Sequence, residues 1–394
     1  MQGLDELGFT TPTPVQEHVI ADAMLGTDIR ACAQTGTGKT MAFVLPALHR
    51  LLTQPTPHKP SVLVMVPTRE LAAQVARVVM EAGKYTGVRS VLILGGANFE
   101  RQVKGIQSGA QIVVATPGRL LDHLRRHTIT LKNIQTLVLD EADRMLDMGF
   151  LPDIRAIMSA CTTKKQTMLF SATFPPEIQK LVGSFFVNPK TVDLAPSIPA
   201  NTVTQMIYPV SGSQKESFLY ALIDQANITS ALIFCRTKHG ADRVGKGLSK
   251  IGKSVTILHS NRSQTERNEA LAGFSARKYQ IMVATDIASR GIDIKEISHV
   301  INYDVPQHPE DYVHRIGRTG RAAATGDAFT IVAPDEEPYL KRIERFINKT
   351  LPRGVLPTFP YLVPPRLIIK PKPLSESFGR ARRRIPTSRH GRFR

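Results

Sequence analysis

The stretch Ala33-Gln34-Thr35-Gly36-Thr37-Gly38-Lys39-Thr40 decides how this chain folds and what it can bind. Its spacing is that of a P-loop, in which backbone amides cradle phosphates, the lysine reaches the β and γ oxygens, and the threonine hydroxyl helps to hold Mg²⁺. Apolar runs predict a strand before it, over residues 29–33, and a helix after it, over residues 41–52. The amides of such a loop lie at a helix N-terminus, which favours anions. We therefore expect Gln34, Thr35, Gly36, Thr37, Gly38, Lys39 and Thr40 to bind a nucleotide; the alternative is a glycine-rich turn without a ligand.

Length and composition limit the class of protein. The chain has 394 residues, which suggests two domains, and 42% of them are apolar, enough for buried sheets. The longest apolar runs, such as residues 62–66, have the length of strands and are far too short to span a membrane. The N-terminus lacks a signal-peptide pattern, so we expect a cytoplasmic protein. The three widely spaced cysteines favour reduced thiols over a disulfide framework or a metal site.

Apolar runs of strand type alternate with helical patterns along most of the chain. In the first half the strands are expected at residues 61–66, 89–94, 111–115, 136–139 and 166–170. After a proline-containing linker, a second series is expected at residues 204–210, 231–235, 254–259, 280–284, 299–302 and 328–332. Such βαβ alternation predicts α/β units with parallel sheets, whose ligands bind at the carboxyl ends of the strands.

Polar segments follow several of these strands, and two of them suggest chemistry. Asp140 and Glu141 end an apolar strand, where a nucleotide-hydrolysing site needs one carboxylate to orient hydrated Mg²⁺ and another to position the attacking water. The alternative is an acidic cluster that only complements a helix dipole. In the second half, which has no P-loop, residues 314–321 carry arginines three apart among glycines. That pattern suits arginine fingers that reach a γ-phosphate held by the other half.

The charge of the chain indicates a polyanionic partner. The formal net charge is +18, and residues 364–394 hold ten Lys or Arg against one Glu. Nucleic acid is the usual partner of such an excess, and a basic solvated surface is the alternative.

These segments, in their order and spacing, resemble the DEAD-box ATP-dependent RNA helicases of superfamily 2 over about residues 8–334. In the first half, residues 8–16 resemble the Q motif, 33–40 motif I, 67–72 motif Ia, 95–96 the GG element, 116–119 motif Ib, 140–143 the DEAD sequence and 171–173 motif III. In the second half, residues 232–238 resemble motif IV, 264–267 the Gln-x-x-Arg element, 284–293 motif V and 314–321 motif VI. Residues 351–353 and the basic tail resemble the bacterial RhlE-like subgroup.

The resemblance implies a fold and domain bounds. It implies two tandem RecA-like domains, each a mostly parallel sheet flanked by helices, followed by a short basic C-terminal tail. The expected bounds are residues 1–194 for the first domain, 195–203 for the linker, 204–350 for the second domain and 351–394 for a basic, disordered tail.

The resemblance also implies roles for single residues, with ATP and Mg²⁺ as cofactors. Catalysis would involve Glu141, Lys39, Asp140, Arg318 and Arg321, and Thr40 and Asp140 would hold Mg²⁺ largely through water. Outside the P-loop, the nucleotide would be bound by Phe9, Thr11, Gln16, Gly291 and Asp293. RNA would be bound by Pro67, Thr68, Arg69, Gly96, Thr116, Pro117, Gly118, Arg119, Arg236, Gln264, Arg267 and Thr285. Coupling between the domains would involve Asp143, Ser171, Thr173 and His314.

The function implied is RNA-stimulated ATP hydrolysis that separates short RNA duplexes locally and remodels RNA or RNA–protein complexes. Two alternatives remain open: an ATP-gated RNA clamp with little unwinding, and a DNA-translocating ATPase of the same superfamily. The expected partner is single-stranded or short duplex RNA, with ribosomal or RNA-degradation proteins as further partners. The protein is expected to be a monomer without membrane contact.

The tail generates the first prediction. Deleting residues 364–394 should weaken the affinity for single-stranded RNA at low salt, because their lysines and arginines are expected to hold RNA by charge. Each lost phosphate contact should also flatten the slope of log K against log salt by about 0.7. The rate of hydrolysis at saturating RNA should change little, because the tail carries no catalytic motif. RNA titrations of the full-length and truncated chains across a salt series measure this, and identical slopes would contradict it.

Overall fold

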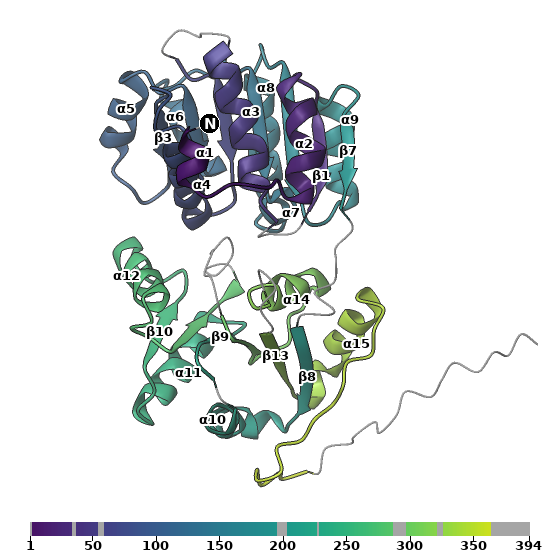
Figure 1. Cartoon of the computed structure of the whole chain (residues 1–394). Coiled ribbons are helices and arrows are strands. Elements are labelled where there is room, and N and C mark those ends of the chain that lie inside the picture. The colour runs from purple at the N-terminus through teal and green to yellow at the C-terminus, as the bar shows by residue number, and fades with distance from the viewer. Residues whose placement is uncertain are drawn as a thin grey trace, which may run out of the picture.

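The computed structural model describes residues 2–33, 37–53, 59–194, 203–226, 228–286, 297–320 and 326–363. Two α/β units follow one another along the chain, each with its own sheet, and they face one another across a junction (Figure 1). The predicted Gln34, Thr35, Gly36, Gly291, Asp293 and Arg321 lie outside the described residues, as do residues 195–202 and the basic segment 364–394.

The sheet of the first unit has seven strands in the order β3-β4-β2-β5-β6-β1-β7, all paired in parallel. Its strands are β1 (Ile29–Cys32), β2 (Val62–Met65), β3 (Ser90–Ile93), β4 (Ile112–Ala115), β5 (Thr136–Asp140), β6 (Gln166–Ser171) and β7 (Lys190–Asp193). The helices are α1 (Gln2–Glu6), α2 (Pro14–Met24), α3 (Lys39–Thr53), α4 (Arg69–Ala82), α5 (Phe99–Gln107), α6 (Pro117–Arg125), α7 (Ala142–Asp147), α8 (Leu151–Ala160) and α9 (Pro176–Phe185).

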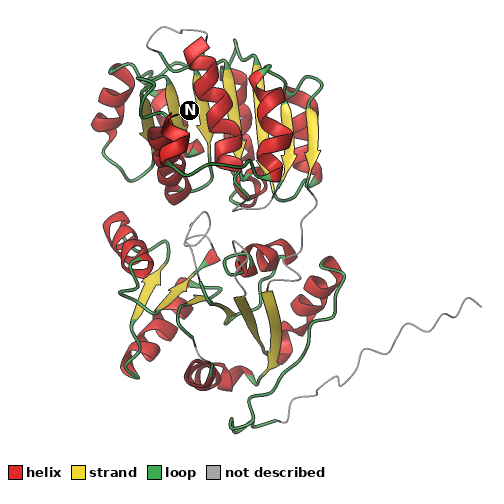
Figure 2. Ribbon diagram, viewed as in Figure 1, coloured by secondary structure: helices red, strands yellow, loops and turns green. Residues whose placement is uncertain are grey.

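The sheet of the second unit has six strands in the order β10-β11-β9-β12-β13-β8, again all parallel. The strands are β8 (Val203–Pro209), β9 (Ala231–Phe234), β10 (Val255–Leu258), β11 (Ile281–Ala284), β12 (His299–Asn302) and β13 (Gly326–Val332). The helices are η1 (Gly212–Gln214), α10 (Lys215–Gln225), α11 (Lys238–Lys250), α12 (Gln264–Ser275), α14 (Pro309–Ile316), η2 (Pro334–Glu336) and α15 (Glu337–Phe346). The predicted fold class, two parallel sheets flanked by helices, is thereby confirmed (Figure 2).

Each sheet is covered on both faces, because successive side chains of a strand point to opposite sides. In β2, Val62 and Val64 join the core beneath α2, α3 and α4, whereas Leu63 and Met65 join the core beneath α6, α8 and α9. This explains why the strands appear in the sequence as uninterrupted apolar runs rather than as alternating ones. The described residues contain no helix long and apolar enough to cross a membrane.

Two parts of the fold differ from the sequence-based expectation. Strand β7 was not predicted, because its residues Lys-Thr-Val-Asp have only Val192 buried, as expected of a strand at the edge of a sheet. The segment 351–363 was expected to belong to the tail, yet Leu351, Leu356 and Phe359 are buried against the second unit. Arg353 also binds Glu344 of α15, so this segment belongs to the second unit rather than to the tail.

The buried carboxylate of Asp28, just before β1, binds β6 and the segment before β7, and it generates a prediction about stability. The Oδ1 atom of Asp28 accepts the backbone N–H of Thr167 at 2.5 Å, and Oδ2 accepts that of Val187 at 2.8 Å. Asp28→Ala leaves both donors unpaired and should lower the free energy of unfolding by about 1–3 kcal/mol for each donor that stays buried. Asp28→Asn keeps one acceptor oxygen and should lower the free energy of unfolding by less than Asp28→Ala does. The urea midpoints of the full-length chain measure this order, and equal midpoints for Ala and wild type would contradict it.

Candidate nucleotide site and junction between the units

The P-loop lysine and the first carboxylate of the DEAD sequence meet at the carboxyl edge of the first sheet. The Nζ atom of Lys39, at the start of α3, lies 3.7 Å from Oδ1 of Asp140, at the end of β5. Both side chains are buried, at 5% and 4% exposure. Strand β5 is separated from β1 by β6 alone, so the topology itself brings these two residues together.

Gln16 connects the first long helix to the P-loop. Its Nε2 donates to the carbonyl oxygen of Gly38 at 3.1 Å, and its Oε1 accepts the N–H of Thr13 at 3.0 Å, which completes a capping box on α2. Gly38 has a φ of +92°, and a Cβ atom there would lie 2.6 Å from Nε2 of Gln16. A glycine is therefore required both by the backbone and by the space that Gln16 occupies.

The environment of Asp140 fits a divalent cation. Burial raises the pKa of the Asp140 carboxyl to about 6, although the Lys39 ammonium opposes this. Thr40 is the residue after Lys39, and its hydroxyl oxygen is a second candidate ligand in addition to the Asp140 carboxylate. Oxygen ligands of this kind are those that Mg²⁺ prefers, and a cation here would stabilise the charged carboxylate.

Glu141 lies between β5 and α7 in a left-handed backbone conformation, with a φ of +54°. Its N–H donates to Oδ1 of Asp140 at 3.0 Å, and its Oε2 lies 2.9 Å from Nη1 of Arg144. Both partners of this ion pair are nearly completely buried. The turn thus directs two carboxylates into one buried site, and the second is oriented by an arginine.

Asp143 links the DEAD sequence to the segment after β6. Its Oδ2 accepts the N–H groups of Ala172 and Thr173 at 3.1 and 2.9 Å and the Thr173 hydroxyl at 3.1 Å. Its own N–H donates to the Ser171 hydroxyl, which in turn donates to the Thr173 carbonyl at 2.6 Å. The structure therefore brings together the three first-unit residues expected to couple the domains.

The second unit closes against this edge through α14 and Arg318, the second residue after that helix. A cavity of about 10 Å³, room for about one water molecule, is bordered by Arg144 of the first unit and by Phe234, Asp286, Asp311, His314, Arg315 and Arg318 of the second. Arg318 is 4% exposed. A predicted arginine finger therefore lies beside the residue that holds Glu141.

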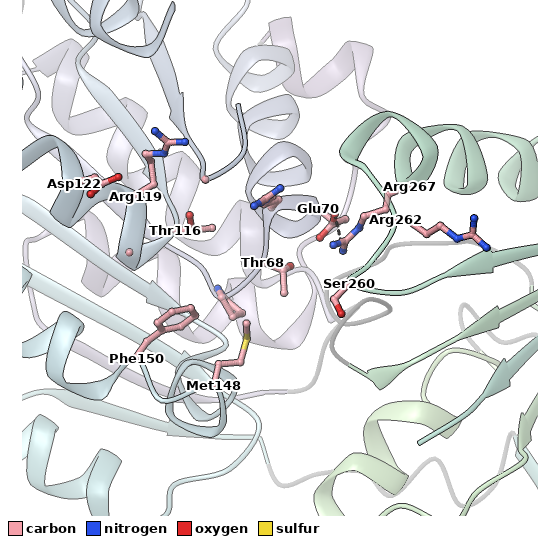
Figure 3. A pocket seen from close by; sticks show the side chains of 14 residues that line it. Thr68, Glu70, Thr116, Arg119, Asp122, Met148, Phe150, Ser260, Arg262 and Arg267 are labelled. Carbon is pink, nitrogen blue, oxygen red and sulfur yellow. Dashed lines mark ion pairs between the residues drawn. The ribbon is translucent and has the colours of Figure 1, made fainter. Parts of the chain in front are cut away.

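A larger cavity, of about 500 Å³, also lies between the units (Figure 3). From the first unit it is lined by Pro67, Thr68, Arg69, Glu70, Gly95, Thr116, Gly118, Arg119, Asp122, Met148 and Phe150, and from the second by Ser260, Arg262 and Arg267. Seven of the residues expected to bind RNA are among them: Pro67, Thr68, Arg69, Thr116, Gly118, Arg119 and Arg267. Its wall carries more basic than acidic side chains, which suits a polyanion.

Contacts across this cavity join the two units. Arg267 of α12 pairs with Glu70 of α4, Nη2 to Oε1, at 2.9 Å, as the dashed line in Figure 3 marks. Gln264 donates to Glu70 at 3.2 Å and accepts from Arg69 at 3.3 Å. The guanidinium of Arg69 also lies against Gly96, where a Cβ atom would clash with it. Burial and then the nearby Arg267 lower the pKa of Arg69, so an anion placed here would stabilise its charge.

Other predicted residues lie apart from these contacts or at their margin. Phe9 is 43% exposed in the segment before α2, and Thr11 is also exposed. Arg236 pairs with Glu336 at 2.8 Å, and the N–H of Thr285 donates to Leu258 at 3.2 Å. Pro117 begins α6, beside the lining residue Gly118.

Three functional candidates were missed from the sequence. Glu70 follows the predicted Arg69, but the sequence did not indicate its ion pair with the second unit. Arg144 follows the predicted Asp143, but the sequence did not indicate its contact with Glu141. Arg315 was passed over between His314 and Arg318; it is 3% exposed and donates to both carboxylate oxygens of Asp286 at 2.6 and 2.7 Å. Its spacing of three residues from Tyr312 places it on the buried face of α14, and that helical spacing is a signal that could have identified it.

Comparison with known proteins identifies similar sequences for both units. The DEAD/DEAH box helicase family matches residues 13–181, and the helicase conserved C-terminal domain matches residues 214–323. A curated relative, the DEAD-box ATP-dependent RNA helicase CshA of Bacillus cereus, is 41% identical over 361 residues, which is 91% of this chain and 68% of the relative.

Two solved structures of one Dbp5 variant from S. cerevisiae are also similar, each with 31% sequence identity over 90% of this chain. The variant bound to RNA and ADP BeF3 is covered to 92% and superimposes with a TM-score of 0.81. The same variant bound to a gle1 variant and ip6 is covered to 91% and superimposes with a TM-score of 0.72.

The ion pair across the larger cavity generates a charge-swap prediction. Arg267→Glu places two carboxylates together and should separate the units, because like charges at this distance repel. The double variant Glu70→Arg with Arg267→Glu restores a pair of opposite charges and should bring the two units together again. The radius of gyration in solution, measured with a non-hydrolysable ATP analogue and single-stranded RNA, should rise in the single variant and recover in the double one.

The control is Lys278→Glu, the same charge change at an exposed residue beyond α12. An equal radius of gyration in Arg267→Glu and Lys278→Glu would show that the ion pair does not hold the units together.

Proposed function

This chain belongs to the DEAD-box ATP-dependent RNA helicases, and from that membership we propose how its residues divide the tasks of hydrolysis and RNA binding. The protein is an ATP-dependent RNA helicase and an RNA-dependent ATPase. The relatives' names favour RNA over DNA as the polymer and strand separation over a clamp with little unwinding. Assignment to the RhlE-like subgroup stays a prediction.

We propose that ATP binds at the edge where Lys39 and Asp140 meet. The P-loop, residues 33–40, would cradle the phosphates, and Lys39 would contact the β and γ oxygens. Gln16 would hydrogen-bond the adenine and Phe9 would pack on its ring, while Thr11, Gly291 and Asp293 would complete the nucleotide contacts. Thr40 and Asp140 would hold Mg²⁺, which supplies Lewis-acid stabilisation of phosphate charge when bound.

The hydrolysis step would use residues from both units beside the γ-phosphate. The Glu141 carboxylate would orient the attacking water and accept its proton, and Arg144 would keep that carboxylate in place. Arg318 and Arg321 would stabilise the charge that develops on the γ-phosphate, as arginine fingers do. The buried position of Arg318 beside Arg144 supports this division.

RNA would bind along the larger cavity between the units. We propose that Arg69, Thr116 and Arg119 contact its backbone, together with Pro67, Thr68, Gly96, Pro117, Gly118, Arg236, Gln264, Arg267 and Thr285. Contacts of these types go to phosphates and 2′-hydroxyls, so the core should have little sequence preference. The Glu70–Arg267 ion pair would keep both walls of the cavity in register.

One observation carries this proposal: the same closure of the two units forms both cavities. Arg144 meets α14 at the nucleotide edge, and Glu70 meets α12 at the RNA edge. ATP and RNA would therefore stabilise the same arrangement and promote one another's binding, as linkage requires. The higher TM-score with the Dbp5 variant bound to RNA and ADP BeF3 than with its gle1 complex supports this state.

Several finer points are proposals without a further observation. We propose that unwinding is local and limited to short duplexes, that Asp143, Ser171, Thr173 and His314 transmit closure between the units, and that the protein acts as a cytoplasmic monomer. Ribosomal or RNA-degradation proteins stay predicted partners.

The test compares ATP hydrolysis stimulated by RNA and by DNA of equal length at matched salt, alongside separation of a short RNA duplex. RNA should stimulate strongly and DNA weakly. Glu141→Gln should abolish turnover but keep or prolong ATP-dependent RNA binding, because only the water-positioning group is lost. Lys39→Ala should lose tight ATP binding as well, because the charge that holds the phosphates is gone.

Two outcomes would contradict the proposal. Equal stimulation by DNA would remove the RNA-specific role of the larger cavity. An equal loss of nucleotide affinity in Glu141→Gln and Lys39→Ala would show that these residues do not divide binding from hydrolysis.

A further inference from the structure

We propose that Arg144 is a positioning residue that makes the orientation of Glu141 depend on closure of the second unit. This inference rests on the proposed role of Glu141 in placing the attacking water. Arg144 touches neither the expected phosphates nor the expected RNA path, so its effect would pass through Glu141 alone.

Arg144 holds the Glu141 carboxylate from within the first unit. Nη1 of Arg144 lies 2.9 Å from Oε2 of Glu141, and Arg144 is 1% exposed. The backbone N–H of Arg144 donates to Oδ1 of Asp143 at 3.0 Å, which fixes the start of its own side chain. A carboxylate in a left-handed turn, held by a buried guanidinium, has few orientations available to it.

The other terminal nitrogen of the Arg144 guanidinium is not satisfied in the same way. Nη2 of Arg144 is buried and has no hydrogen-bond partner among the residues that the structure describes. Arg144 also forms part of the wall of the small cavity, whose other lining residues all belong to the second unit. A buried, half-satisfied guanidinium is costly, so a water molecule in that cavity would stabilise it once the units are closed.

Stability alone does not explain this arrangement. A buried ion pair often contributes no more to the free energy of unfolding than apolar residues of the same volume would. An arginine, however, is planar and presents separate nitrogens, so it can bind a carboxylate on one side and a second group on the other. With that geometry, contact of the second unit with one side of Arg144 can change how firmly the other side holds the Glu141 carboxylate.

When the units separate, the second unit's wall of the cavity is removed and Nη2 is exposed to bulk water. The guanidinium can then turn, and Glu141 loses its fixed partner. Hydrolysis would therefore be fast only in the closed, RNA-bound arrangement, even when ATP already occupies the P-loop.

The experiment uses the full-length chain with Arg144→Met, which keeps an unbranched apolar stem but loses the guanidinium, and Arg144→Lys, which keeps the charge without the fork. Arg155→Met on the exposed side of α8 is the matched control. In Arg144→Met, kcat with saturating RNA should fall by about 10- to 100-fold, the range typical of partners that orient a reacting group. KM for ATP and the affinity for RNA should stay within about twofold, and Arg144→Lys should recover part of kcat.

A double-variant cycle separates positioning from structural damage. Because steady-state turnover is lost in Glu141→Gln, the cycle is measured on its residual single-turnover hydrolysis. If Arg144 acts through Glu141, adding Arg144→Met should slow that residual hydrolysis no further. A multiplicative loss, a matching fall in ATP affinity, or a kcat equal to that of Arg155→Met would each overturn the inference. A normal rate in Glu141→Gln would instead overturn the proposed function of Glu141, so the two failures are distinguishable.

Discussion

The approach of the Lys39 ammonium to the Asp140 carboxylate is the interaction around which the first unit is organised. Two opposite charges at 3.7 Å, both withdrawn from water, are tolerated only where further polar groups complete their shells. Here the N–H of Glu141, in the turn after β5, donates to Asp140, and Gln16 of α2 holds Gly38, the residue before Lys39. The ion pair therefore lies where α2, the P-loop and the turn after β5 meet at one edge of the sheet.

The sequence was sufficient to predict most of the fold, for a physical reason. Parallel strands buried on both faces must be apolar throughout, and the short strands β2, β4 and β9 each appear as such a run. The exposed edge strand β7 carries little apolar signal, and only contact with β1 forms it. The segment 351–363 was misjudged because its few apolar residues gain a core only from β8 and α10, which lie far away in the sequence.

The candidate site likewise has a part that the sequence predicted and a part that only the structure shows. Motif spacing placed Lys39, Asp140 and Arg318 because each follows a strand or belongs to a short polar segment at a helix end. Motif spacing could not show which residues form ion pairs. The roles of Arg144, Glu70 and Arg315 follow from their ion pairs, which only the three-dimensional structure shows. Spacing along the chain identifies the groups that a reaction needs, whereas the groups that orient them emerge only from packing.

The left-handed backbone at Glu141 has a consequence for how the protein can evolve. A side chain with a φ of +54° costs roughly 1–2 kcal/mol relative to ordinary backbone, and glycine would remove that strain. Glycine would also leave the buried Arg144 guanidinium without its carboxylate, and an unpaired buried charge costs about 3–5 kcal/mol. The ion pair therefore outweighs the backbone strain, so selection for stability alone would keep a carboxylate at this strained turn.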